Sequence, residues 1–390
     1  MRWLYPLFLL STLAMAQFPG GAPPSKGPWS NPKLPPEERA RLLVQAMTLD
    51  EKIQMVHGIG WFFGADMNLS GQEPPPIVYR SNGGGGFIPG IPRLGVPDLQ
   101  MNDAMVGSGG GARMGRYSTA MPSALALASS WDLDLAREYA AQIGKELRDQ
   151  GYNITLGGGL NLTREPRNGR NFEYLGEDPL LAGRMAAAYV QGKQSQGIVG
   201  IVKHYALNNQ ESGRYFVNVR MPRKGARESE LLAFEIAVKE GQPGSVMCSY
   251  NLYEGDYACE NAYLLNDVLK KEWNWPGFVM SDWGGTHSTV KAALNGLDME
   301  MPGNTFFAEA LKAAVEKGEV PMARLDDMVQ RILWALFRAG AFDRRPQRQV
   351  PDIFRGFEVA QKAAEAGIVL LKNDRAILPL DPQMKGTIAV

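Results

Sequence analysis

The sequence predicts an α/β fold built on a parallel sheet, and a (β/α)8 TIM-type barrel fits its length. Between residues 152 and 338, short apolar segments alternate with segments of helical pattern, and this alternation is typical of parallel sheets. The strand-like segments are apolar at nearly every position, as expected for strands covered on both faces. No G-x-G-x-x-G motif opens a helix after the first strand, which disfavours a dinucleotide-binding fold.

The first 16 residues are predicted to be a signal peptide. Arg2 precedes an apolar stretch, and Ala14-Met15-Ala16 has the small-x-small pattern of a cleavage site. The alternative, a membrane anchor, is disfavoured because the apolar stretch is too short to span a bilayer. We therefore expect an exported protein, periplasmic or extracellular. Residues 17–36 are rich in proline and glycine and are expected to form an extended arm.

The barrel domain is expected to cover residues 37–341 and to open with helices. A helical pattern covers 37–47, and Thr48 with Glu51 forms a capping box that begins a second helix. Residues 58–130 are expected to be rich in loops. A further helix is expected over 132–150.

The alternating region follows. Strands are expected over 152–156, 198–202, 245–249, 278–281 and, as a short one, 297–301. Helices are expected over 179–196, 228–239, 262–273, 286–295, 306–317 and 324–338. Asp178 is the expected N-cap of the first of these helices, with Pro179 at its first position.

The C-terminal residues indicate a second domain. Residues 342–356 are charged and contain proline, as in a linker. Residues 357–390 have the pattern of one helix, over 357–366, and two strands, over 368–371 and 387–390. Elements this few cannot bury a core of their own. We expect them to be the truncated beginning of an α/β sandwich domain.

Composition excludes several classes of function. The chain has 41 Lys and Arg against 41 Asp and Glu, whereas nucleic-acid-binding proteins usually carry a basic surplus. After the N-terminus, no run reaches the ~18 apolar residues of a membrane span. With three histidines and two cysteines, a metal site built on them is not expected, and no cofactor is indicated.

The two cysteines, Cys248 and Cys259, are candidates for a disulfide. Exported proteins retain disulfides, and this one would fix the loop after Tyr250. The alternative is two buried thiols that never meet.

Polar residues gather where the expected strands end. Barrel enzymes place their sites at the C-terminal ends of their strands, so these side chains are expected to converge on one rim. They suit a hydroxyl-rich ligand, with an aromatic face to pack against a sugar ring. The candidates are Arg170, Lys203, His204, Tyr250, Asp282 and Trp283.

Asp282 is the sharpest candidate. A carboxylate there can attack an anomeric carbon and form a covalent glycosyl-enzyme, and Lys203 and Arg170 would keep it ionised. The alternative is an N-cap for the helix near Thr286. Lys203 has two alternatives, a structural ion pair or the Schiff-base lysine of an aldolase. His204 alone is equally compatible with a hydrogen-bonded packing residue, and Tyr250 with a rim aromatic.

Four segments together resemble glycoside hydrolase family 3: residues 161–179, 201–211, 245–251 and 277–283. Residues 366–380 resemble the family's entry into its second domain. The resemblance implies a retaining, exo-acting β-glycosidase, a β-glucosidase or β-xylosidase that needs no metal or cofactor.

The resemblance also implies roles for individual residues. Asp282 matches the nucleophile, and Tyr250 would lie beside it. Arg170, Lys203 and His204 would bind sugar hydroxyls. Asp103 would bind the distal hydroxyls, although Ala104 stands where the family usually has glycine.

The family's acid/base is a Glu of the second domain, which we expect outside these residues. The chain alone is therefore expected to turn over poorly. The alternative function is a non-catalytic carbohydrate-binding remnant that lacks the acid/base.

Overall fold

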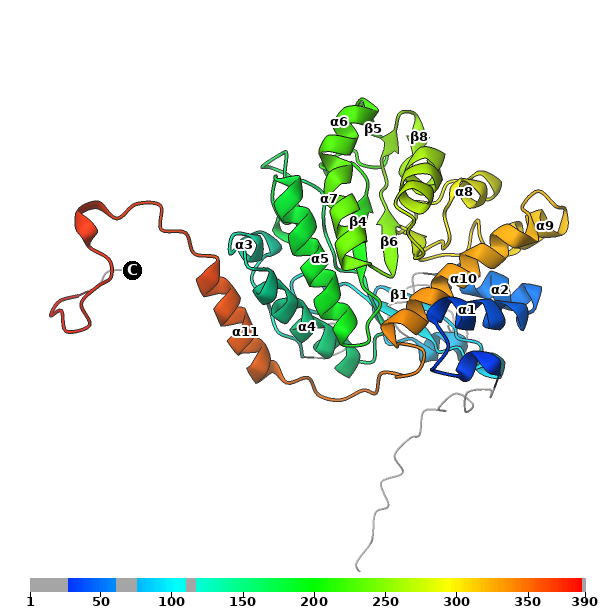
Figure 1. Cartoon of the computed structure of the whole chain (residues 1–390), viewed down its shortest axis with the longest axis horizontal. Coiled ribbons are helices and arrows are strands. Elements are labelled where there is room, and N and C mark those ends of the chain that lie inside the picture. Colours follow the sequence, from blue (N-terminus) through cyan, green and yellow to red (C-terminus); the bar gives the residue numbers. More distant parts are fainter. Residues whose placement is uncertain (1–26, 61–75, 110–116, 388–390) are drawn as a thin grey trace, which may run out of the picture.

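The computed structural model describes residues 27–60, 76–109 and 117–387 (Figure 1). The expected signal peptide, half of the arm and nearly all of the strand at 387–390 lie outside this part. Its strands are β1 (Gly86–Ile88), β2 (Leu99–Asn102), β3 (Ile154–Thr155), β4 (Ile201–Tyr205), β5 (Asn218–Val219), β6 (Ser245–Cys248), β7 (Leu252–Tyr253), β8 (Asp256–Tyr257) and β9 (Phe278–Ser281).

Helices surround these strands, and each of the expected helices has a counterpart. The α-helices are α1 (Pro36–Gln45), α2 (Leu49–Met55), α3 (Ala124–Ala128), α4 (Leu133–Asp149), α5 (Pro179–Ser195), α6 (Arg223–Glu228), α7 (Glu230–Ile236), α8 (Val290–Asn295), α9 (Glu309–Glu316), α10 (Met322–Ala339) and α11 (Ile353–Ala366). Two π-helices cover Ala237–Gly241 and Tyr263–Glu272.

The expected caps are present. Thr48 and Glu51 form the reciprocal capping box at the start of α2. The Asp178 carboxylate accepts from the backbone of Leu181 at the start of α5, with a proline in its first turn. These local hydrogen bonds satisfy N–H groups that a helix leaves free at its N-terminus.

The strands pair mainly in parallel, as strand–helix alternation requires. The order β4-β6-β9 is parallel throughout, and β2-β3 is also parallel. Single bridges continue this succession: Ile154 with Val199 and Gly159 with Lys203 join β3 to β4, and Met280 with Met299 extends it beyond β9. Glu300 in turn pairs with His57. An α/β fold is therefore confirmed.

A complete eight-stranded barrel is not confirmed. The assigned sheets contain three strands each, and β1 runs antiparallel to β2. Within the described residues, no bridge joins β1 to the segment at His57. Several neighbouring segments are joined by single bridges only. In each of these pairs, one segment stays in the sheet for no more than a residue or two. The barrel remains a prediction.

A close approach between two backbone segments explains the glycine at position 158, next to β4. Gly158 has φ +156°, and a Cβ there would collide with the Ile201 carbonyl oxygen. In turn, Lys203 donates its backbone N–H to the Gly158 carbonyl. Only glycine lets the chain after β3 lie this close to β4.

Two of the expected strands are not formed as such. Residues 297–301 contribute only single bridges, at Met299 and Glu300. Residues 368–371, expected to be a strand, form none, and their side chains are exposed, from 59% for Leu370 to 91% for Leu371. A strand requires a partner edge for its N–H and C=O groups, and the described chain offers none here. In Figure 1 this tail leads away from the body of the molecule.

The last helix begins earlier than expected and packs on the body. α11 starts at Ile353, inside the expected linker, and lies beside α3 and α4 (Figure 1). Arg355 and Lys362 both pair with Glu138 of α4. The division between a barrel and a second domain near residue 357 is untested and stays a prediction.

A single large apolar cluster lies between the strands and the helices. It extends from α1 to α11 and includes fully buried residues of β4, β6 and β9. Among the described helices, none combines the length and the apolar character that crossing a membrane requires.

Candidate active site

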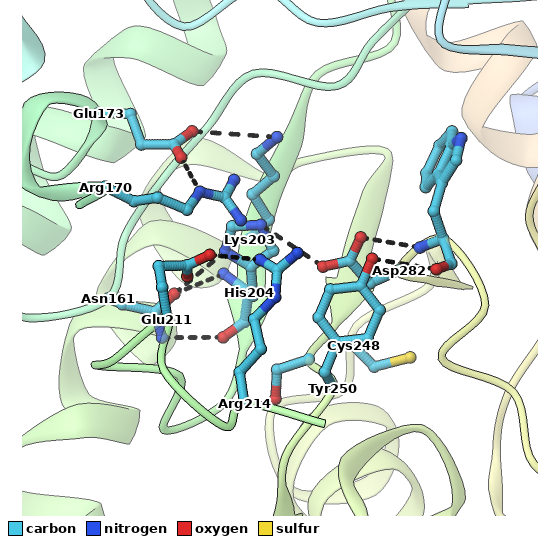
Figure 2. Close-up of polar contacts among 12 residues, drawn as sticks. Asn161, Arg170, Glu173, Lys203, His204, Glu211, Arg214, Cys248, Tyr250 and Asp282 are labelled. Atoms are coloured by element: carbon cyan, nitrogen blue, oxygen red, sulfur yellow. Dashed lines mark hydrogen bonds and ion pairs between the residues drawn. The ribbon is translucent and has the colours of Figure 1, made fainter. Parts of the chain in front are cut away.

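A cavity of about 170 Å³ lies at the C-terminal ends of β4, β6 and β9. Six of the seven side chains expected at a sugar site belong to its neighbourhood, brought together from segments up to 180 residues apart, from position 103 to position 283. Figure 2 shows the central group. The cavity is lined by Gly85, Asp103, Leu156, Arg170, Lys203, His204, Met247, Asp282 and Trp283.

Asp282 directly follows β9 and faces this cavity. Its Oδ1 accepts from the Trp283 backbone N–H at 2.8 Å. Its Oδ2 is buried, receives no hydrogen bond from the described residues, and lies 3.7 Å from His204 Nε2 (Figure 2). The carboxylate does not cap a helix, since α8 begins at Val290 with Thr289 as N-cap. The alternative based on helix capping is therefore wrong.

Burial shifts the pKa of Asp282. Loss of solvation raises the pKa of this carboxyl group, whereas Lys203, the Trp283 N–H and Arg170 lower it, and the net direction is upward. From the sequence, Lys203 and Arg170 are expected to keep the group ionised. They do favour the ionised form, but they only partly offset the desolvation.

Lys203 and Arg170 are held by carboxylates. Lys203 Nζ lies 3.3 Å from Asp103 Oδ1 and 4.0 Å from Glu173 Oε2. Arg170 Nε donates to Glu173 Oε1 (Figure 2). Glu173 is 93% shielded from solvent at its side chain, whereas Asp103 is 63% exposed there. The buried Glu173 thus holds both cations in place. The exposed Asp103 remains accessible to a ligand.

His204 is a buried, neutral imidazole. Burial and the cations Arg170, Lys203 and Arg214 hold its pKa well below the ordinary value. Asn161 fixes its backbone, since Oδ1 accepts from the His204 N–H at 2.8 Å and Nδ2 donates to its carbonyl at 2.9 Å. The interaction with Asp282 is therefore that of a neutral ring beside a carboxylate.

Two aromatic residues border the nucleophile candidate. Trp283 donates its indole N–H to the Gly85 carbonyl at 2.8 Å, which orients the ring at the cavity wall. Tyr250 does not line the cavity itself. Its hydroxyl donates to the Trp283 carbonyl at 3.0 Å, so the ring lies beside Asp282 (Figure 2). Burial, followed by the Asp282 charge, raises the pKa of Tyr250.

Cys248 and Cys259 are joined by a disulfide with their Cα atoms 5.2 Å apart. Both residues are fully buried. Cys248 pairs with Ser281 in the β6–β9 register, one residue before Asp282. The bridge therefore ties the loop that begins at Tyr250 to the strand beside the candidate nucleophile.

Three residues of the site were missed by the sequence reasoning. The sequence alone assigns no role to Glu173, Asn161 or Arg214. The Arg214 guanidinium lies 4.4 Å above the Tyr250 ring and pairs with Glu211. Only the spacing of Arg170 and Glu173, three residues apart across a 3-10 turn, was a signal available in the sequence.

Comparison with known proteins adds a family. The model of the glycosyl hydrolase family 3 N-terminal domain matches residues 92–335. Beta-glucosidase B of Emericella nidulans is 38% identical over 294 residues, covering 74% of this chain and 35% of that protein. A beta-glucosidase of Bacteroides ovatus is 38% identical over 325 residues, covering 76% of this chain and 43% of that protein.

Solved structures agree. Beta-glucosidase 3B from Thermotoga neapolitana in complex with glucose superposes with a TM-score of 0.78 at 34% identity, covering 88% of this chain and 48% of that one. A beta-glucosidase from Streptomyces venezuelae in complex with D-glucose gives 0.77 at 36% identity, covering 88% and 43%.

The chain is an α/β protein with a buried carboxylate, two fixed cations and a tryptophan around one small cavity. The family match covers more than half of the chain, and the chain belongs to glycosyl hydrolase family 3. It spans 35% to 43% of the length of the curated relatives described above.

Proposed function

We propose that the chain is the nucleophile-bearing part of an exported, retaining, exo-acting β-glycosidase, of β-glucosidase or β-xylosidase type. The observation that carries the proposal is the buried Asp282 carboxylate, with one oxygen free of hydrogen bonds from the described residues, facing a cavity lined by Lys203, His204 and Arg170. The relatives named beta-glucosidases support the sugar class. We also propose that the strand succession is an irregular (β/α)8-type barrel.

The proposed first step is attack on the sugar. An electron pair of the Asp282 carboxylate forms a bond to the anomeric carbon, and the bond from that carbon to the glycosidic oxygen breaks. The departing oxygen takes a proton from a general acid. Asp103, Lys203, Arg170 and His204 hold the hydroxyls of the terminal sugar, and Trp283 packs against its ring.

The second step releases the sugar. Water gives a proton to the same acid/base group and attacks the anomeric carbon, breaking its bond to Asp282, with retention of configuration. We propose that this group is a Glu supplied by a second domain, as the family resemblance implies. The relatives, more than twice as long as the matched region, leave room for such a domain.

Covalent labelling tests the proposal. An activated 2-fluoro glucoside carries a good leaving group, so its first step depends little on the acid. Mass spectrometry of a digest should place the label on the peptide with Asp282, and Asp282→Asn should abolish it. A label on Lys203 trapped by borohydride would support the aldolase alternative instead.

Turnover distinguishes the enzyme from a binding remnant. We expect the 390-residue chain to hydrolyse a nitrophenyl glucoside poorly and a version extended by the second domain to hydrolyse it well. Full activity of the short chain would place the acid inside it. Sugar binding without labelling or turnover in either form would indicate a non-catalytic carbohydrate-binding remnant.

A further inference from the structure

A buried lysine lies behind the wall of the candidate active site. Lys193, in the last turn of α5, has no exposed surface. Its Nζ donates to the Ala104 carbonyl, to Thr155 Oγ1 at 2.9 Å and to the Gly157 carbonyl at 3.4 Å. All three acceptors are neutral, so these contacts supply no counter-charge. The proposed reaction gives Lys193 no role, and its burial requires another reason.

The buried amine is costly for the fold. Burial, followed by the charge of Lys203, holds the pKa of Lys193 well below its ordinary value. This shift favours the uncharged amine, which can donate two hydrogen bonds and accept one from the Thr155 hydroxyl. An apolar side chain would fill the same space without the cost of burying a polar group. The residue is therefore better explained by what its hydrogen bonds hold than by packing.

The three acceptors flank two residues that line the active-site cavity. Ala104 directly follows Asp103 in the chain. Thr155 and Gly157 stand on either side of Leu156. Asp103 and Leu156 both line the cavity. The amine thus connects, from behind the wall, the two segments that present these side chains to a ligand.

A second side chain of α5 holds the same segment. Tyr189 lies about one helical turn before Lys193, and its ring centroid is 4.3 Å from the lysine Nζ. The Tyr189 hydroxyl lies 2.7 Å from the Ala104 carbonyl oxygen and 2.8 Å from that of Met105. The Ala104 carbonyl is therefore held by two buried side chains of one helix.

Asp103 depends on this anchoring because its side chain is largely exposed. Among the described residues, that side chain pairs only with Lys203, at 3.3 Å. Its backbone carbonyl accepts from Gly109 at 2.6 Å, and the preceding Asn102 carbonyl accepts from Leu156 at 2.7 Å. The place of the carboxylate is therefore set by the backbone rather than by packing around the side chain.

We propose that Lys193 is a positioning residue, which fixes Asp103 where its carboxylate can bind a sugar hydroxyl. The role of Asp103 as a sugar ligand belongs to the proposed function, on which this positioning role rests. Lys193 is not part of the cavity lining and acts through the backbone at Ala104. A carboxylate already held in place binds a hydroxyl more strongly, because less freedom is lost when the ligand binds.

Labelling of Asp282 by an activated 2-fluoro glucoside measures the effect, because this sugar lacks only its 2-hydroxyl. In the 390-residue chain, Lys193→Met should lower the second-order rate constant of labelling roughly tenfold. In an Asp103→Asn background the same change should lower it by less than about twofold, because a residue that acts through Asp103 has nothing left to position. An equal factor in both backgrounds, or no loss in either, overturns the proposal.

Amide exchange distinguishes failure of the positioning role from failure of the proposed function. The N–H groups of Leu156 and Gly109 bond to the segment that carries Asp103. Lys193→Met should make both exchange faster, while exchange in β6 stays unchanged. A parent chain that takes no label on Asp282 would contradict the proposed function. Faster exchange of these two amides would then still support the anchoring, and unchanged exchange overturns it whatever the labelling shows.

Two further variants of α5 guard against misfolding. Tyr189→Phe keeps the buried ring, removes the hydroxyl that bonds to Ala104, and should slow labelling by roughly two- to fivefold. Arg184→Met is the matched control, since this cation of the same helix is exposed and lies 4.0 Å from Glu240. It should leave labelling and exchange unchanged. A loss as large as that in the Lys193 variant would overturn the proposal, because the effect would belong to the helix as a whole.

Discussion

Asp282 combines two demands that oppose one another. In its proposed role as nucleophile it must be ionised, yet the cavity in which it lies removes it from water and raises its pKa. Lys203 and Arg170 supply the compensating charge, and Glu173 holds both cations in place. The ionisation of Asp282 therefore depends on these neighbouring charges as well as on its own burial.

This balance predicts a pH dependence. The rate of labelling by a 2-fluoro glucoside should fall as pH falls through the raised pKa of Asp282, at a pH above the ordinary carboxyl value of 3.8. Lys203→Met removes the largest effect that lowers this pKa, so the midpoint should move to still higher pH. The midpoint is read from the labelled fraction by mass spectrometry.

The control for the labelling profile is Lys271→Met, an exposed lysine paired only with Asp267. It should leave the midpoint in place. A midpoint that stays fixed, or moves to lower pH, in the Lys203 variant would contradict the assignment of that lysine as the main charge facing Asp282.

His204 gives a second prediction at the same scale. Because its folded pKa lies well below 6.5, the ring should stay neutral, and its NMR resonances should not titrate between about pH 5 and 8. The unfolded chain does take up that proton below 6.5. Hence this residue lowers the free energy of unfolding as pH falls below 6.5, and the loss grows until the folded pKa is reached. Titration of the folded ring near 6.5 would show that His204 is solvated.

At the scale of elements, the disulfide contributes to stability and closes a loop next to the candidate active site. It closes the loop from Cys248 to Cys259, with a sequence separation of 11, and that loop contains Tyr250. Replacing both cysteines with alanine should lower the free energy of unfolding by about 3 kcal/mol, mainly by freeing the unfolded chain. Denaturant melts with and without reductant measure the change.

The disulfide prediction has an internal check. Reductant should shift the midpoint of the parent protein towards that of the double variant and leave the variant itself unaffected. Equal midpoints for all four samples would mean that the two sulfurs are not bonded in solution.

Local patterns predicted the elements well where the cause is local. The strand at 278–281 and the start of the helix at Pro179 were placed correctly, because an apolar run or an N-cap with proline determines each within a few residues. The predicted ends of an element were less accurate where tertiary contacts determine them. For example, α8 begins four residues later than expected. The expected strand at 368–371 is not formed, because an apolar pattern gives a strand only where a neighbouring sheet edge is present to pair with it.

The candidate site was predictable only in part. Strand ends identified Lys203, His204 and Asp282, since parallel strands deliver their C-terminal ends to one edge. Asn161 could not be ranked from sequence, because its partner His204 lies 43 residues away. For Glu173 only the spacing to Arg170 was a signal, since its contact with Lys203 is formed by the fold. The antiparallel β1 was likewise hidden within a region rich in glycine and proline.

For the whole molecule, α11 shows how the C-terminal part of the chain is attached. Sequence assigned most of this helix to a second unit, whereas it packs on α3 and α4, and its Arg355 and Lys362 both pair with Glu138 of α4. Such exposed pairs contribute little. Close packing at Gly356, against Thr119 and Glu146, is the stronger constraint.

Gly356→Ala tests this attachment, because two effects oppose one another there. Alanine favours the helix itself by roughly 1 kcal/mol. Its Cβ, however, would lie 2.8 Å from Thr119 Cβ and 2.9 Å from Glu146 Oε1, and overpacking of this kind costs about 1–3 kcal/mol. We expect packing to dominate, so that amide exchange across Ile353–Ala366 becomes faster while exchange in α5 is unchanged. Gln361→Ala, on the exposed face of α11, should not accelerate exchange, and slower exchange in the Gly356 variant would mean that α11 is held by its own helicity rather than by α4.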